Sequence, residues 1–253
     1  MAPDLYVQQD QPEGVPPLHL TGERTLPDVP EENYWFRRHL VVYEWIAERV
    51  PGLDVVDMAC GEGYGSDVLA RRARSVTGVD ANPEAYEHAR LKYRRPNLRF
   101  VHDLVESYAE PCDAIVFLQT IEHLERPDSA LEHFRAMLRP RGTAYVSTPN
   151  VLTLAPPGAE KSANPWHVRE YRAEEFRAVC EASFAHVELL GVFHARKLRA
   201  HELALALGWD SLHRRLRLTR PFYGHLVPAI SARDFAVRRG DLDRALDFLA
   251  VLR

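Results

Sequence analysis

This chain of 253 residues has few cysteines, no long apolar run and little excess of charge of one sign. Its three cysteines lie far apart and lack CxxC spacing, so the sequence indicates neither a disulfide framework nor a zinc site, and it suits a reducing cytoplasm. No apolar run approaches the roughly 20 residues that span a bilayer, so no transmembrane segment is expected. The first residues lack the basic start and apolar stretch of a signal peptide. We therefore expect a cytoplasmic protein, and the number of subunits is left open.

The charge balance disfavours one class of partner. Lys and Arg number 32 against 36 Asp and Glu, a formal net charge of −4. A mildly acidic chain is a poor candidate for nucleic-acid binding, so no nucleic-acid partner is expected. Residues 194–220 are a local exception, because basic residues outnumber acidic ones there and lie among leucines and Trp209. This segment is either a solvated face or a basic surface for a phosphorylated or acyl-CoA-bound acceptor, a membrane or a nucleic acid.

The composition predicts an arm followed by one domain. Residues 1–30 are rich in proline and hold few large apolar residues, which predicts an extended N-terminal arm. Residues 31–253 suffice for a single domain with one sizeable core, since 46% of the chain is hydrophobic. Apolar residues recur at helical spacing in 31–50, which predicts an N-terminal cap helix, and about 195–230 is predicted to be a helical insertion.

Strands and helices alternate through the rest of the chain. Asn82 and Pro83 begin one of the helices, with Asn as the N-cap and Pro at the first helical position. Such alternation is typical of βαβ units, so we expect an α/β, doubly wound fold with a mostly parallel sheet. The expected strands are 53–60, 75–80, 98–103, 113–119, 143–150, 186–193 and a last one from about 245, and the expected helices are about 64–73, one from 83, 128–138 and 173–184.

A glycine-rich loop joins the first strand to the first helix of this pattern. Its sequence, DMACGEGYG from Asp57 to Gly65, has GxGxG spacing. Glycines at such a place let the backbone turn sharply and approach a ligand closely. Ligands of open α/β sheets bind at the carboxyl ends of the strands. The spacing alone indicates a nucleotide-binding turn and does not identify the nucleotide.

Acidic residues end the first three strands and narrow the choice of ligand. A carboxylate at Asp57 repels a pyrophosphate but suits a ligand that carries an ammonium group. Asp80 is placed to accept both ribose hydroxyls of an adenosine, as an acid in dehydrogenases also does. Asp103 is placed to accept the adenine amino group, unless it is a plain strand-end acid. An adenosine joined to a cationic amino acid without phosphate describes S-adenosylmethionine, the predicted cofactor, with S-adenosylhomocysteine as its product.

Several segments of the chain resemble class I S-adenosylmethionine-dependent methyltransferases. They are DMACGEGYG, VTGVD, IEHLERPDSALEHFRAMLRPRG and VSTPN, which follow one another in the expected order across residues 53–150. The resemblance implies a Rossmann-like methyltransferase fold with a seven-stranded sheet. It also implies cofactor contacts at Asp57, Gly61, Gly63, Asp80 and Asp103.

A narrower resemblance extends over most of the chain. The segments LTGERT (20–25), ENYWFRRH (32–39), NPWHVREY (164–171) and GVFHARKLR (191–199) are similar to a group of actinobacterial methyltransferases. Members of that group are associated with methylated polysaccharides such as the methylglucose lipopolysaccharides. The resemblance implies O-methylation of a saccharide or of another small-molecule hydroxyl, and the fold does not settle which acceptor is used.

Methyl transfer from a sulfonium is an in-line displacement whose leaving group is already activated, so in principle it requires no metal, and none is predicted. Orientation of the acceptor supplies much of the rate, and a hydroxyl acceptor also needs a base. His123, after the fourth strand, and His167, after the fifth, are the candidate bases, because imidazole titrates near ~6.5. Both positions also suit a purely structural histidine. Gln119, at the end of the fourth strand, is a predicted cofactor contact.

The predicted cap helix offers a clamp for the cofactor carboxylate. Tyr34, Trp35 and Phe36 are consecutive, and Arg37 and Arg38 follow them. Aromatic rings can cover an adenine or a sulfonium, and a guanidinium can clamp a carboxylate. Arg38, or alternatively Arg37, is the predicted clamp. The other interpretation is a helix packed on the sheet whose arginines extend to solvent.

Three other functions stay open at the level of the sequence. The first is a methyltransferase that acts on nucleic acid or protein, although no NPPY-type tetrapeptide follows the fourth strand, where Leu118-Gln119-Thr120-Ile121 stands. The second is an NAD-dependent oxidoreductase, which Asp57 disfavours. The third is a non-catalytic protein that binds the cofactor, which no damaged motif supports.

Overall fold

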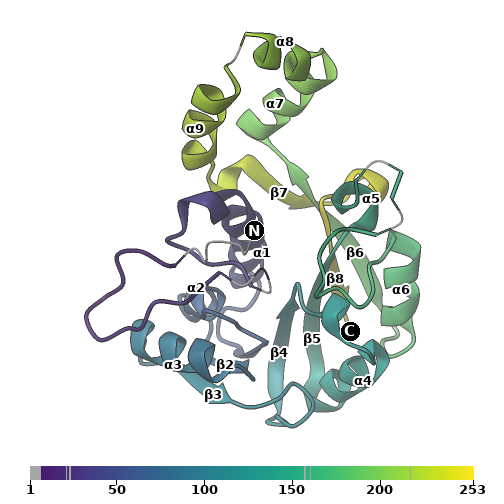
Figure 1. The fold of residues 1–253 in the computed structure, drawn as a ribbon. Coiled ribbons are helices and arrows are strands. Elements are labelled where there is room, and N and C mark those ends of the chain that lie inside the picture. Colours follow the sequence, from purple (N-terminus) through teal and green to yellow (C-terminus); the bar gives the residue numbers. More distant parts are fainter. Residues whose placement is uncertain (1–6, 21, 23, 157, 160, 217) are drawn as a thin grey trace.

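The computed structural model describes residues 7–253 apart from 21, 23, 157, 160 and 217. Its described strands form one eight-stranded sheet in the order β3-β2-β1-β4-β5-β8-β6-β7, with helices on both faces (Figure 1). The strands are β1 (Asp54–Met58), β2 (Ser75–Asp80), β3 (Leu98–His102), β4 (Cys112–Leu118), β5 (Leu138–Pro149), β6 (Val187–His194), β7 (Phe235–Arg238) and β8 (Asp247–Leu252).

Strands β1 to β5 form the parallel half of the sheet. Residues 114–118 of β4 show why, because this apolar run is buried on both faces, as strands covered by helices on both sides require. β1 pairs with β2 on one side and with β4 on the other, so the strand order reverses beside β1. The carboxyl ends of these strands meet at one edge of the sheet, which we call the carboxyl edge. Open α/β sheets bind their ligands at such a place.

The other half of the sheet is antiparallel, and here the expectation from the sequence is wrong. β8 lies between β5 and β6 and runs antiparallel to both, and β7 pairs with β6. The sheet is therefore mixed and has eight described strands, instead of seven that are mostly parallel. The strand expected from about 245 is present as β8. β7 escaped prediction because it has four residues and leads directly into Arg239, Gly240 and Asp241, which do not continue a strand pattern.

Two separate apolar clusters hold helices on the two faces of the sheet. One cluster includes Ile46 of α1 and Leu69 of α2, and the other includes Phe134 of α4 and Phe176 of α6. Asn82 caps α3 as predicted, because its side chain accepts from two backbone N–H groups of the first turn. The first six α-helices along the described chain are α1 (Asn33–Ala47), α2 (Tyr64–Ala70), α3 (Pro83–Lys92), α4 (Pro127–Met137), α5 (Val151–Leu154) and α6 (Ala173–Glu181).

Three further helices occupy the segment in which an insertion is predicted. They are α7 (Arg196–Ala206), α8 (Trp209–Arg215) and α9 (Thr219–Ala229), and they project from the sheet beyond β7 (Figure 1). Several leucines of this segment are exposed, most of all Leu207, which lies between α7 and α8. Within the described part of the chain, no helix is long and apolar enough to cross a membrane.

The N-terminal arm is extended but anchored. Between residues 7 and 29, where the structure describes it, the arm forms no helix or strand beyond an isolated bridge of Val7 with His19. Leu18 and Leu26 are buried. The Gln8 side chain donates to Glu62 Oε1 at 3.2 Å, which ties the arm to the glycine loop.

Candidate functional site

The glycine loop keeps its shape through left-handed backbone angles. Gly61 and Gly63 have φ values of 56° and 95°, a region that glycine enters readily because it lacks a Cβ. A Cβ on Gly63 would lie 2.8 Å from the Cβ of Ala89, and a Cβ on Gly65 would lie 2.1 Å from the Tyr43 ring. The first two glycines of the GxGxG spacing therefore make the turn, and the third lets α2 approach α1.

Asp80 ends β2 and braces the glycine loop. Its Oδ2 accepts from the Gly61 N–H at 2.7 Å, and its Oδ1 accepts from the Asn82 N–H at 2.9 Å. Asp103 follows the neighbouring strand, and its carboxylate accepts from the Leu104 N–H at 2.8 Å. Both aspartates are partly exposed. The structure thus places the loop and these two acids together at the carboxyl edge, and their contacts with a cofactor stay a prediction.

Asp57 lies beneath the glycine loop with a fully buried side chain. The Tyr43 hydroxyl donates to Oδ1 at 3.3 Å, and the Ser66 hydroxyl donates to Oδ2 at 2.6 Å. Burial raises the pKa of Asp57 to about 7, although these two hydrogen bonds lower it. The carboxyl therefore joins α1 and α2 to β1, and its direct contact with the cofactor ammonium stays a prediction.

Replacing Asp57 with asparagine is expected to flatten the dependence of stability on pH between about pH 4 and 7. The folded pKa is about 7 and the unfolded pKa is about 3.9. The folded protein therefore binds more protons than the unfolded chain in this interval, so wild-type stability falls as the pH rises and stops falling above the folded pKa. Protonation of Asp57 therefore accounts for a loss of wild-type free energy of unfolding on the order of 1–4 kcal/mol across this interval.

Urea denaturation of both proteins at pH 5 and pH 8 measures this difference. The variant should lose less stability between the two pH values than the wild type. Other groups, Glu122 among them, titrate in both proteins, so their contributions to the change in stability cancel in the comparison. An equal loss in the two proteins would show that Asp57 is not protonated on folding.

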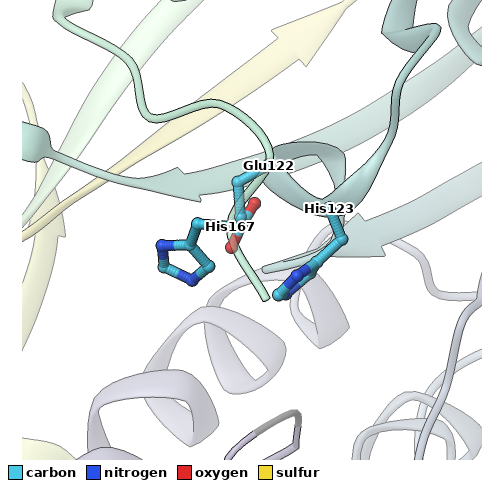
Figure 2. Close-up of side chains that lie close together, drawn as sticks. All are labelled: Glu122, His123 and His167. Carbon is cyan, nitrogen blue, oxygen red and sulfur yellow. The ribbon is translucent and has the colours of Figure 1, made fainter. Parts of the chain in front are cut away.

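Three side chains converge beyond β4, as Figure 2 shows. The 3-10 turn η2 (Ile121–His123) carries Glu122 and His123, and the loop between α5 and α6 carries His167. The two imidazole centroids are 5.1 Å apart, and one ligand atom from each of the three side chains lies within 4.8 Å of the others. The Glu122 carbonyl accepts from the Val168 N–H at 2.9 Å, which ties the turn to the loop. The two predicted bases are therefore neighbours.

Hydrogen bonds orient both imidazoles of this cluster. His123 Nδ1 lies 2.8 Å from the carbonyl oxygen of Trp166 and donates its proton to it. His167 Nδ1 donates in the same way to Glu170 Oε1 at 2.6 Å. A neutral imidazole with its proton on Nδ1 carries its lone pair on Nε2. At His167 this atom accepts from the Asn164 amide at 3.0 Å.

Glu122 and Glu170 differ in their electrostatic surroundings. Glu122 is buried, and the Thr148 hydroxyl donates to its Oε2 at 3.1 Å. Burial raises the pKa of Glu122 to about 8. Burial also acts on Glu170, but hydrogen bonds from Ser162 and His167 hold the pKa of Glu170 below its ordinary value. Glu170 is therefore the ionised partner of His167.

Gln119 stands at the end of β4 in an uncommon conformation. Its φ is 53°, a left-handed value that a residue other than glycine seldom adopts. Its side-chain amide donates to Ser147 Oγ at 3.0 Å, and its backbone N–H donates to the Ser147 carbonyl at 3.1 Å. These bonds fix a sharp turn at the carboxyl edge, and the predicted contact of Gln119 with the cofactor stays a prediction.

Arg38 turns into the protein instead of toward solvent. Its Nε donates to Asp247 Oδ2 at 2.6 Å, and its Nη2 donates to both Asp247 Oδ1 and the Leu246 carbonyl. Arg37 lies over the Phe36 ring. The buried ion pair joins α1 to the start of β8, and the role of Arg38 as a clamp for the cofactor stays a prediction.

Sequence reasoning missed residues that support the site. Tyr43 holds Asp57, yet it lies in a helix whose aromatic residues all fit a packing role. Glu62 accepts from His88, Lys92 and Tyr93 as well as from the arm, and it lies inside the GxGxG motif as an unassigned letter. Glu170 follows His167 by three residues, and this short spacing was an available signal for a His–Glu pair.

Comparison with known proteins decides the family. The sequence matches the family model described as a methyltransferase domain over residues 34–236. The chain belongs to this methyltransferase family. A probable S-adenosylmethionine-dependent methyltransferase of Mycolicibacterium smegmatis is 40% identical over 249 residues, which cover 92% of this chain and 94% of that protein. S-adenosylmethionine is therefore the cofactor, and the oxidoreductase alternative is set aside.

More distant proteins share parts of this methyltransferase. The ubiquinone biosynthesis O-methyltransferase of Xylella fastidiosa is 33% identical over 129 residues, which cover 46% of this chain and 52% of that protein. A solved structure of a possible histamine N-methyltransferase from Thermotoga maritima has a TM-score of 0.58 at 17% identity and covers 88% of this chain and 95% of that chain. The structural likeness shows the Rossmann-like methyltransferase fold.

Proposed function

We propose that this methyltransferase transfers the methyl group of S-adenosylmethionine to a hydroxyl of a saccharide or of another small molecule. The observation that carries the proposal is the pair of oriented imidazoles at the carboxyl edge. His123 and His167 both donate through Nδ1, which makes Nε2 the basic atom of each ring. A hydroxyl must lose its proton as its oxygen attacks carbon, so O-methylation needs a base at this place, whereas a neutral amine can attack without one.

The reaction is a single displacement at the methyl carbon. The hydroxyl proton passes to an imidazole Nε2 in the cluster formed by Glu122, His123 and His167. His123 is the more exposed of the two histidines. The hydroxyl oxygen forms a bond to the methyl carbon while the carbon–sulfur bond breaks. The electron pair of that bond stays on sulfur, so S-adenosylhomocysteine leaves. Alignment of the oxygen with the methyl group supplies much of the rate.

Trp166 favours an acceptor with a ring. The residue is 49% exposed, and its carbonyl is the group that orients His123. An exposed indole offers a flat apolar face to a pyranose or an aromatic ring, and the partly exposed Thr120 and Asn164 offer polar groups nearby that fix orientation. The likeness to the Xylella fastidiosa O-methyltransferase supports oxygen as the methylated atom.

Replacing His123 with alanine is expected to lower kcat by about 10²–10⁴-fold, the usual effect of losing a positioned base, without weakening the binding of S-adenosylmethionine. Mass spectrometry of product and S-adenosylhomocysteine measures turnover over a panel of saccharides and phenols. Each hydroxyl acceptor is paired with its amino analogue, and NMR locates the new methyl group.

A matched control is His133→Ala. His133 also bonds to a backbone carbonyl, that of Tyr108 at 2.7 Å, but it lies on α4 away from the cluster. This variant should keep wild-type turnover. Unchanged turnover in His123→Ala, or methylation of the amino analogues alone, would overturn the proposal.

A further inference from the structure

We infer that Glu122, His123 and His167 bind a divalent first-row transition-metal ion. This inference rests on the proposed function and assigns the cluster a defined chemistry. Each side chain offers one ligand atom, and the three atoms lie within 4.8 Å of one another (Figure 2). Two imidazole nitrogens and one carboxylate oxygen form the donor set that Zn²⁺ and Fe²⁺ take in open sites, where further positions remain for water or substrate.

The contacts behind the ligands point to a metal independently of that spacing. Histidines that bind a metal through one nitrogen donate the other N–H to a backbone carbonyl or a carboxylate. Both histidines do so here, His123 to the Trp166 carbonyl at 2.8 Å and His167 to the Glu170 carboxylate at 2.6 Å. Glu170 is itself held by the Ser162 N–H at 2.8 Å. Both Nε2 atoms are therefore the atoms that can reach an ion.

The burial of Glu122 fits a bound cation as well. A buried carboxylate destabilises a fold unless a positive charge or several hydrogen bonds compensate it. Within the described residues Glu122 forms no ion pair with lysine or arginine, and its carboxylate accepts from the neutral Thr148 hydroxyl. A divalent ion would supply the positive charge that an ionised Glu122 needs in this buried place.

Only small movements of side chains are needed to bring the three ligand atoms within bonding distance of one ion. Two ligands at about 2.1 Å from a tetrahedral ion lie about 3.4 Å apart, so the widest pair has to approach by side-chain rotation. The Asn164 amide, which donates to His167 Nε2 at 3.0 Å, has to turn aside. Both changes involve side chains of a loop and a 3-10 turn and leave the sheet in place.

The ion changes the part that the histidines take in the reaction. An acceptor hydroxyl bound in an open position of the ion loses its proton to water more easily, since a divalent metal lowers the pKa of a bound oxygen acid. The resulting oxygen then attacks the methyl carbon, and sulfur keeps the electron pair as before. His123 and His167 are then ligands, and the proton goes to water instead of to an imidazole.

Titration of tag-free, chelator-treated protein with Co²⁺ and with Zn²⁺ tests the inference without any acceptor. Co²⁺ is followed by its visible absorption and Zn²⁺ by calorimetry. We expect one saturable site per chain. Glu122→Gln and His123→Gln should weaken it by at least about 100-fold, more than the loss of an outer contact does. His133→Gln, the matched control, should bind as the wild type does.

The outcomes separate this inference from the proposed function. Absence of a saturable site, or wild-type affinity in His123→Gln, would overturn the metal site while O-methylation with the histidines as bases still stood. A site that binds the ion in a protein that methylates only amines would support the metal site and overturn the proposed O-methylation. Circular dichroism and S-adenosylmethionine binding confirm that each variant is folded, and if Glu122→Gln is not, His123→Gln decides.

Discussion

Replacing Arg38 with methionine is expected to lower the free energy of unfolding by about 3–5 kcal/mol, because it leaves a buried carboxylate without its partner. The side chains of Arg38 and Asp247 are 4% and 1% exposed, so water cannot replace the lost cation. Methionine keeps most of the apolar stem of the arginine, so packing changes little. Denaturation by urea at pH 7 measures the difference.

The double variant Arg38→Met/Asp247→Leu is the control for this prediction. Removal of both charges also removes the desolvation penalty, so most of the lost stability should return. A double variant no more stable than the single one would show that loss of packing, and not the unpaired carboxylate, explains the effect. The same protein tests the predicted clamp, since a stable double variant with weak affinity for S-adenosylmethionine would place Arg38 at the cofactor carboxylate.

Replacing Asp80 with alanine is expected to weaken the binding of S-adenosylmethionine and S-adenosylhomocysteine by about 100-fold, or about 3 kcal/mol, because hydrogen bonds to a charged group contribute roughly 1.5–3 kcal/mol each. Asp80 is partly exposed at the carboxyl edge beside the glycine loop, where an adenosine ribose is predicted. Titration calorimetry with both sulfur ligands measures the loss, and NAD should give no response.

A second variant separates the ribose contact from the support of the loop. Asp80 accepts from Gly61 and Asn82, so alanine removes a brace together with the predicted ribose contact. Asp80→Asn keeps an acceptor oxygen and removes the charge, and an intermediate affinity is expected. Affinity in Asp80→Ala equal to that of the wild type would exclude the ribose role, and thermal melts without ligand report any loss of support.

The parallel half of the fold could be predicted because its signals are local. Each strand, its loop and the next helix lie within about thirty residues, the length of a βαβ unit. The capping by Asn82 and the GxGxG turn are set by residues next to each other in the sequence. The direction of β8 is different, because it depends on the path that the chain takes from β7 and not on the residues of β8 itself.

The sequence allowed the residues of the candidate site to be predicted, but not the contacts between them. His123 and His167 each follow a strand, and that position singled them out. Their approach depends on how the loop after α5 crosses the carboxyl edge, which no short pattern encodes. The pairing of Arg38 with Asp247 joins residues 209 apart in the sequence, so the two consecutive arginines near the start of α1 gave no sign that one of them is buried.

The place of β8 also bears on the order in which the protein folds. β8 follows β6 and β7 along the chain but lies between β5 and β6 in the sheet. The units from β1 to β5 can pair as the ribosome releases them, whereas the antiparallel pair of β6 and β7 has no place in the sheet until β8 has been made. Contacts such as Ala144 with Leu252 close very long loops, which slows folding. A chain waiting for this strand exposes the open side of β5, where another chain or a chaperone can pair with it.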